Sequence, residues 1–144
     1  MEKHNSYTTS ELFKDIKRAS ALSEAIHSIE MNSVCPSVHG YLSELLKKHH
    51  IEKADVIRLS NLERSYGYQV FSGHRIPGRN GLLSIAIAMH LTLDETQRLL
   101  KIAQRGALYP KVKKDAAVIY CIYNQLDLEE AEALLERIGE SLLR

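Results

Sequence analysis

The feature that most constrains this chain is the stretch from Val56 to Pro77, VIRLSNLERSYGYQVFSGHRIP, which predicts two short helices joined by a tight turn. Asn61 lies between them, and asparagine is one of the few residue types besides glycine that adopt the left-handed conformation. Glu63 stands beside the positive end of the second helix. That helix can end at Gly73, which is suited to a left-handed C-terminal cap.

Two helices joined this tightly form a helix-turn-helix, whose second helix can lie in the major groove of DNA. The charges fit that role, because the 27 residues from Arg64 to His90 contain no Asp or Glu in a chain that is 26% charged. Residues 64–114 carry nine Lys or Arg against two acids, whereas residues 1–63 carry eight against nine and residues 115–144 carry two against seven. This distribution indicates a middle segment that faces phosphates and a C-terminal segment that faces elsewhere.

The same stretch resembles the XRE (Cro and lambda-repressor-like) helix-turn-helix family, whose signature runs roughly LAeklGvskstisrwErGkrkPs. Laid on this sequence without a gap, its Leu-Ala pair falls on Val56 and Ile57, and its turn glycine falls on Asn61. The base-reading turn of the recognition helix falls on Ser65–Gln69. The likeness continues through Leu82–Leu100, LLSIAIAMHLTLDETQRLL, which is similar to the fourth and fifth helices of the family.

The resemblance covers about Val38 to Ala103, and the family's GkrkP exit falls on Gly73–Pro77, including a basic His-Arg pair. Three residues depart from the family pattern. Ile57 replaces a small alanine where the two helices approach closely, Gly67 replaces a buried Ile or Val, and Phe71 replaces the habitual Glu. These departures affect the packing of the helices and the register of the base contacts.

The resemblance implies that bases are read from the front of the second helix and that phosphates are held by the basic and polar residues around it. Gln69 can make a bidentate bond to adenine, and a tyrosine can meet a thymine methyl or donate to a phosphate. The alternative is that Tyr66 or Tyr68 packs inward to fill the space left at Gly67, and that Arg79 is an ordinary solvated charge. The residues expected to contact DNA are Lys53, Arg64, Ser65, Tyr66, Tyr68, Gln69, Ser72, His74, Arg75 and Arg79.

We therefore expect an all-α fold: a lambda-repressor-like five-helix DNA-binding bundle with an N-terminal amphipathic helix and a C-terminal helical hairpin. The expected segments are residues 1–37 (tail and amphipathic helix), 38–105 (DNA-binding domain) and 106–144 (hairpin packed on it). The expected function is sequence-specific binding of double-stranded DNA by a transcriptional repressor that acts as a homodimer. The alternative is a protein-interaction module, an antitoxin or adaptor with a degenerate helix-turn-helix.

The N-terminal segment from Ser10 to about Met31 has apolar residues at helical spacing and predicts one amphipathic helix, with Ser20 as a candidate break. Its apolar stripe has to be buried, either against the chain's own globular domain or as a dimerisation arm. This segment and the acidic C-terminal face, Asp127–Glu140, are also the places where a protein partner could bind.

Two further helices are predicted after the helix-turn-helix. Gly81–His90, with Asn80 as its expected cap, is apolar nearly all round and should be the buried centre of the bundle. The helix that follows starts with Thr92 and Glu95, which are spaced as a capping box.

The C-terminal tail repeats this helix pair after a shift of 35 residues. LTLDETQRLL at Leu91–Leu100 matches LDLEEAEALL at Leu126–Leu135. We expect a second hairpin of Lys113–Asn124 and Leu128–Leu143 that extends the core. A coincidence between two amphipathic hairpins is the alternative.

No catalytic constellation is present, so we expect neither an enzyme nor a cofactor. His39, His49 and His50 invite a metal-site hypothesis, but no Cys or carboxylate stands at ligand spacing with them. Cys35 and Cys121 are too few for a disulfide framework. The polar start and the short apolar runs predict no signal peptide and no membrane span, which favours a cytoplasmic protein.

Overall fold

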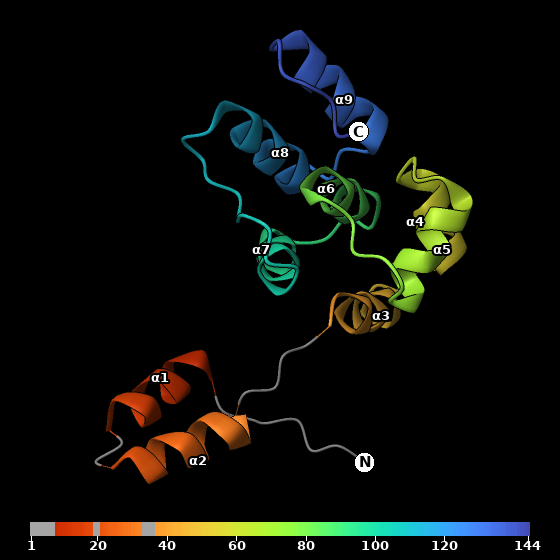
Figure 1. Ribbon diagram of the computed structural model, residues 1–144. Helices are drawn as coiled ribbons and strands as arrows, with labels where there is room; N and C mark the ends of the chain where they lie inside the picture. Colours follow the sequence, from red (N-terminus) through yellow and green to blue (C-terminus); the bar gives the residue numbers. More distant parts are fainter. Residues whose placement is uncertain (1–7, 19–20, 33–36) are drawn as a thin grey trace. The chain divides into compact units, whose positions relative to one another are not determined.

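The computed structural model describes residues 8–18, 21–32 and 37–144 (Figure 1). Every regular element within these ranges is a helix, so the expected all-α class is confirmed. The chain divides into two units, Met1–Cys35 and Pro36–Arg144. No helix in the described part of the chain has the length and apolar character that crossing a membrane requires.

The N-terminal unit holds two helices, α1 (Thr9–Arg18) and α2 (Leu22–Asn32), that lie side by side as a hairpin (Figure 1). The expected amphipathic segment is therefore two helices, divided between Arg18 and Leu22, where Ser20 was the candidate break. Thr8 caps α1, because its Oγ1 accepts from the Glu11 backbone N–H at 3.2 Å while the Glu11 carboxylate accepts from the Thr8 N–H at 3.0 Å. No side chain of α1 is buried, because two short helices have little apolar surface to cover each other.

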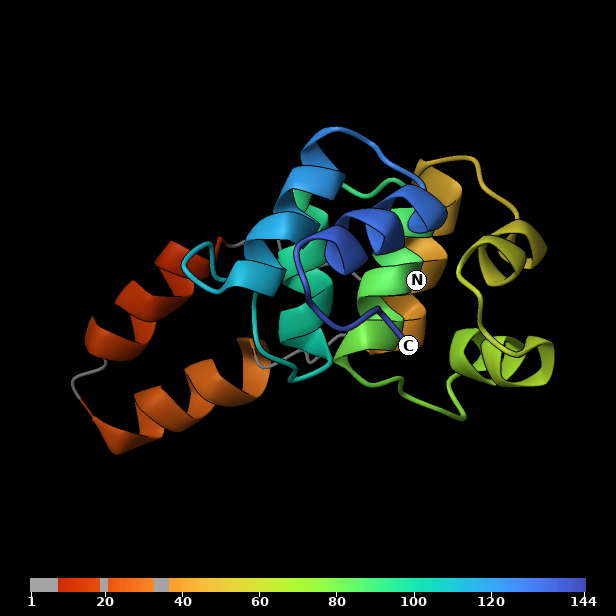
Figure 2. The ribbon, with the colours of Figure 1, turned by 90° about the horizontal axis from the view of Figure 1, so that it is seen from above.

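The larger unit is built around one central helix (Figures 1 and 2). Its elements are α3 (Val38–Lys48), α4 (Lys53–Leu59), α5 (Arg64–Ser72), α6 (Arg79–Ala88), α7 (Leu93–Ile102), α8 (Lys113–Tyr123) and α9 (Leu128–Arg137). Helix α6 packs on α4, α7, α8 and α9, and every residue from Leu82 to Met89 is buried. The prediction that this helix is the buried centre is confirmed. Its cap was wrongly predicted: Gly78 is the N-cap, and Asn80 lies in the first turn.

Helices α4 and α5 form the predicted pair of short helices with a tight turn. Asn61 has φ 57°, and Gly73 has φ 89° as the left-handed C-cap of α5, so both turn predictions are confirmed. Helix α5 packs on α3 and α4 through Gly67, Val70 and Phe71, which are buried. Phe71 therefore adds apolar surface to the core.

The expected second hairpin is present as α8 and α9, and its turn has the same backbone geometry as the turn between α6 and α7. His90 and Gln125, 35 residues apart, have φ 52° and 51°. The residue after each donates its N–H across the turn at 3.0 Å, Leu91 to Ala86 and Leu126 to Cys121. Both second helices also begin with a capping box, Thr92 with Glu95 in α7 and Asp127 with Glu130 in α9.

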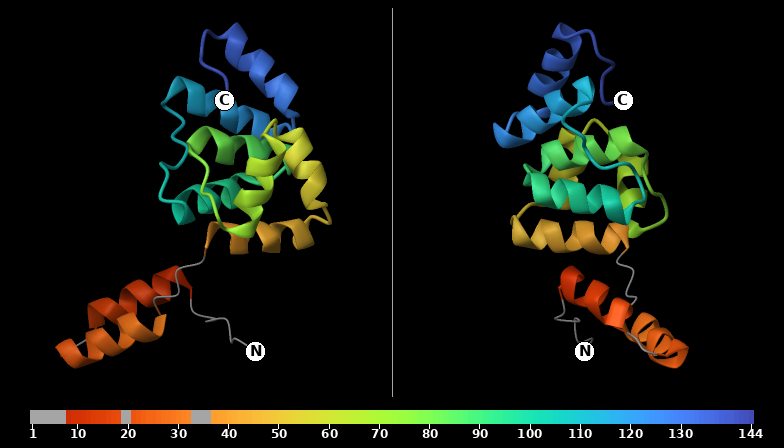
Figure 3. Two further views of the ribbon diagram at one scale, coloured as in Figure 1. Left: turned by 45° about the vertical axis from the view of Figure 1, so that its right-hand side comes forward. Right: turned by 90° about the vertical axis from the view of Figure 1, so that its left-hand side faces the viewer.

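Helix α9 is shorter than predicted, because it ends at Arg137 and Gly139 then takes φ 78°. The last residues run back along the hairpin (Figure 3). Leu143 is buried, and its carbonyl accepts from the Ser84 hydroxyl of α6 at 3.0 Å. The side-chain amide of Asn80, also in α6, donates to the next carbonyl of the C-terminal segment, that of Arg144, at 3.4 Å. The C-terminal segment thus closes the core over α6 without being helical.

Candidate functional site

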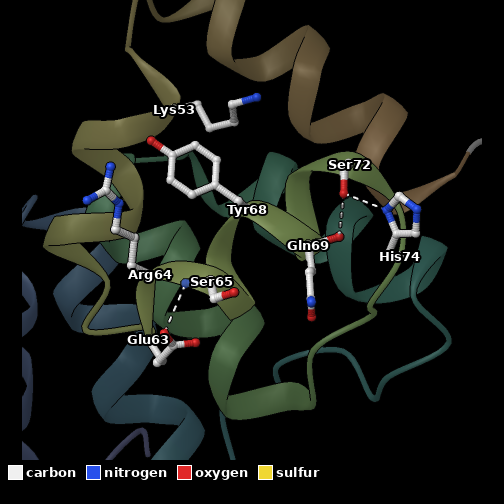
Figure 4. Close-up of a pocket in the computed structure, with 8 residues that line it drawn as sticks. All are labelled: Lys53, Glu63, Arg64, Ser65, Tyr68, Gln69, Ser72 and His74. Carbon is white, nitrogen blue, oxygen red and sulfur yellow. Dashed lines mark hydrogen bonds between the residues drawn. The ribbon is translucent and has the colours of Figure 1, made fainter.

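An open pocket of about 770 Å³ lies over the outward face of α5 (Figure 4). Seven of the ten residues expected to contact DNA line it, together with one residue that the sequence did not single out for this role. The lining residues are Lys53, Glu63, Arg64, Ser65, Tyr68, Gln69, Ser72 and His74. The tertiary structure therefore gathers most of the expected surface in one place.

The alternation of buried and exposed residues along α5 explains this gathering. Ser65, Gln69 and Ser72 recur at intervals of four and three residues, so they lie on one side of the helix and are exposed. Val70 and Phe71 lie on the opposite side and are buried. The core anchors α5 by its apolar side, and its polar side is left outward.

Tyr68 lies between two cations. Its ring centroid is 5.6 Å from the Lys53 Nζ of α4 and 6.0 Å from the Arg64 Cζ at the start of α5 (Figure 4). Tyr68 is 36% exposed, so each cation–π contact contributes only about 0.5–1 kcal/mol. Lys53 and Arg64 thus place two positive charges beside an aromatic ring in the lining of the pocket.

Glu63 is the lining residue that sequence reasoning missed as part of the site. It is the N-cap of α5, and its carboxylate accepts from the backbone N–H groups of Tyr66 at 2.9 Å and Ser65 at 3.1 Å. These backbone hydrogen bonds, from Tyr66 first and then Ser65, lower the pKa of Glu63. The sequence signal was an acid immediately before the helix. Because Glu63 takes these two N–H groups, they are not available to bind a phosphate.

At the other end of α5, Ser72 links the helix to the loop that follows. Its Oγ donates to the Gln69 carbonyl at 3.2 Å and lies 2.8 Å from Nδ1 of His74 (Figure 4). The Gln69 side chain points outward, away from this backbone contact (Figure 4). The imidazole is therefore held near the helix end while the Gln69 amide stays accessible.

Tyr66, Arg75 and Arg79 do not line the pocket. Tyr66 is half-buried and packs against the hydrophobic core, which leaves it poorly placed for base reading. The alternative that one of the two tyrosines packs inward is therefore confirmed for Tyr66, but Ile57 rather than a tyrosine fills the space beside Gly67. Arg75 is exposed in the loop after α5, as a phosphate contact requires.

Arg79 has a structural role, so its expected phosphate contact needs correction. Its two Nη atoms each donate to the Asp115 carboxylate at 2.8 Å, and its Nε donates to the Gly106 carbonyl at 2.8 Å. Hydrogen bonding to Asp115 raises the pKa of Arg79. Burial alone would raise the pKa of Asp115, but Arg79 and the Tyr109 backbone N–H together lower it. These contacts fix the α7–α8 loop and the first turn of α8 to the start of α6.

A second polar cluster, centred on Glu95, joins α3 to α7. The Glu95 carboxylate accepts from Lys48 Nζ at 2.8 Å and from the Thr92 backbone N–H at 2.9 Å, and His49 Nε2 lies 2.9 Å from it. Burial raises the pKa of Glu95, but hydrogen bonds from Lys48, Thr92 and His49 outweigh it and lower the pKa to about 2. Within the described ranges, no group of His, Cys, Asp or Glu is arranged to hold a metal ion.

Comparison of the chain with protein-family models, with curated proteins and with solved structures found no match.

Proposed function

We propose that this chain is a sequence-specific double-stranded DNA-binding protein, a cytoplasmic transcriptional repressor that binds its operator as a homodimer. In this proposal α3 to α7 form a lambda-repressor-like bundle of the XRE type, and α4 and α5 are its helix-turn-helix. The observation that carries the proposal is the outward polar face of α5, which lies beside Lys53 and Arg64. A helix anchored on one side and polar on the other can enter a major groove.

The pocket residues divide into two groups by their chemistry. Gln69 and Ser65 are exposed and can hydrogen-bond base edges, with adenine as the natural partner of Gln69. Tyr68 can meet a thymine methyl group or donate to a phosphate through its hydroxyl. Lys53, Arg64 and Arg75 are exposed cations that fit the phosphates on either side of the groove, with His74 beside them.

Glu63 is the one acid at this interface and affects the proposal in two ways. Its charge, fixed at the start of α5, repels nearby phosphates and so restricts how the helix can approach the backbone. A carboxylate can also accept from the amino group of cytosine. Its two oxygens already accept from the backbone, which fixes the position from which they would do so.

The same carboxylate favours a second candidate function, a protein-interaction module. A pocket that holds two cations, an aromatic ring and an acid also suits a peptide of mixed charge. In that case the helix-turn-helix would serve as an antitoxin or adaptor surface.

Salt dependence separates the two functions. We would measure binding of the full chain to a fluorescent random 30-base-pair duplex by anisotropy, from 50 to 200 mM KCl. If about four phosphates are neutralised, the affinity should fall about 100-fold over this range. A matched variant, Lys53→Ala with Arg64→Ala, should flatten the slope. Absence of measurable binding at 50 mM KCl, or a slope near zero, would rule out DNA binding. Selection of bound sequences from a random pool would then identify the operator.

A further inference from the structure

Helix α8 is apolar on two opposite faces. Its inner face is buried in the core and consists of Ala117, Val118, Cys121 and Ile122. Its outer face, which we call the tyrosine stripe, consists of Ala116, Ile119, Tyr120 and Tyr123, of which Ala116 and Ile119 are half-buried; Val112, the N-cap residue, precedes it. Spacings of three and four residues keep the stripe on one side of the helix. Tyr123 is 68% exposed, Tyr120 55% and Val112 47%. Exposed apolar residues gathered on one face of a helix are typical of a surface that a partner covers.

The two ends of the tyrosine stripe carry opposite charges. Lys111 and Lys113 lie at its N-terminal end. The segment after its C-terminal end contains Asp127, Glu129 and Glu130, all exposed. From residue 115 to residue 136 the sequence has no Lys or Arg. The stripe itself carries no charge.

We propose that the tyrosine stripe is the surface on which a second copy of this chain docks, with the two α8 helices antiparallel. A two-fold axis through the stripe places the lysine end of each copy against the acidic end of the other, so the same charge match forms twice. A basic or an acidic peptide would match only one end. Tyrosine suits the contact, because its apolar ring can be covered while its hydroxyl reaches the polar rim.

This inference names the interface of the dimer in the proposed function and rests on that part of it. The test of this interface measures the oligomeric state without DNA. A failure of the proposed interface is therefore distinguishable from a failure of DNA binding. The interface also leaves the DNA-facing helix free, because α5 and α8 lie on opposite sides of α6 (Figures 1 and 2). Two short helices give a contact at the small end of the range for specific complexes, which corresponds to micromolar association.

The test is sedimentation velocity of the full chain from 1 to 200 µM without DNA. We expect a reversible monomer–dimer equilibrium, with Tyr123→Glu raising the dissociation constant at least 30-fold. Phe13→Glu, which changes an exposed apolar residue of the N-terminal hairpin, should leave it within threefold. Tyr120→Ser with Tyr123→Ser removes the rings without adding charge and should have the same effect as Tyr123→Glu. Far-UV circular dichroism checks that each variant is folded.

Several outcomes would overturn the proposal. A monomeric wild-type chain at 200 µM would do so, as would dimers that survive loss of both tyrosines. Dissociation by Phe13→Glu would assign the interface to the N-terminal hairpin instead. The antiparallel arrangement has its own test, since Lys113→Glu and Glu129→Lys should each weaken the dimer three- to tenfold while the double variant recovers it. A double variant weaker than either single one would exclude that arrangement.

Discussion

Ile57 fills the volume that a side chain at position 67 would need. A Cβ atom built on Gly67 would lie 2.6 Å from Ile57 Cγ2 and 2.9 Å from Ile57 Cγ1, closer than real Cβ contacts allow. Both residues are buried where α4 crosses α5. The large residue at 57 and the missing side chain at 67, where the sequence differs from the XRE pattern that it resembles, are therefore a single exchange of volume between neighbouring helices.

Because the two residues share one volume, substitutions at positions 57 and 67 should have non-additive effects on stability. Gly67→Val alone should destabilise the fold by about 1–3 kcal/mol through overpacking. Ile57→Ala alone should cost about 2–4 kcal/mol through a cavity. The double variant should lose at least about 1 kcal/mol less unfolding free energy than the two single variants lose together, because valine then fills the cavity. Urea unfolding followed at 222 nm measures all three, and additive losses would show that the residues are independent.

Gln69→Ala tests base reading at the candidate interface. If Gln69 bonds an adenine edge, its loss should weaken binding to the selected operator by about 1–3 kcal/mol, or 5- to 150-fold. Binding to random duplex DNA should be almost unchanged, because that affinity comes from phosphates. Competition anisotropy with both duplexes measures the affinity for the operator relative to the affinity for random DNA. An equal loss on both would show that Gln69 does not read sequence.

Arg79 and Arg75 form a matched pair of cations with opposite expected effects. Arg79→Ala leaves the buried Asp115 carboxylate without its main partner, so we expect a loss of about 3 kcal/mol in unfolding free energy. The DNA affinity of the folded fraction should stay within threefold. Arg75→Ala should leave stability within about 0.5 kcal/mol and weaken binding to all sequences. Reversed effects would return Arg79 to the DNA interface.

Glu95 predicts a specific loss of stability in acid. Its pKa is about 2 in the folded chain against an ordinary value of 4.5, so its stabilisation is present above pH 4.5 and is lost as the pH falls toward 2. The difference corresponds to at most about 3 kcal/mol. Glu95→Gln should be less stable at pH 7 and show a flatter decline between pH 4.5 and 2.5. Glu44→Gln, an exposed change on α3, is the control. If the unfolding free energies of wild type and Glu95→Gln fall in parallel with pH, Glu95 is not the source of this loss of stability.

Local signals in the sequence predicted much of the structure. The left-handed turns at Asn61 and Gly73 and the capping box at Thr92 depend on a few neighbouring atoms, so residue type was enough to place them. The buried centre at α6 followed from a run of apolar residues that leaves no polar face. The predictions failed where a residue distant in the sequence decided the outcome. Arg79, for example, is held by Asp115, 36 positions away.

In the candidate site, too, the sequence predicted some features and contacts between helices decided others. The resemblance to the XRE pattern placed Ser65 and Gln69 on the outward face of α5, and 3.6 residues per turn explains why they lie opposite the buried Val70 and Phe71. Only the packing of α5 on α3 and α4 decided that Tyr66 turns toward the core, that Tyr68 lies between Lys53 and Arg64, and that Glu63 joins the pocket. Periodicity fixes directions within one helix, whereas contacts between helices depend on volumes and charges that meet only when the chain is folded.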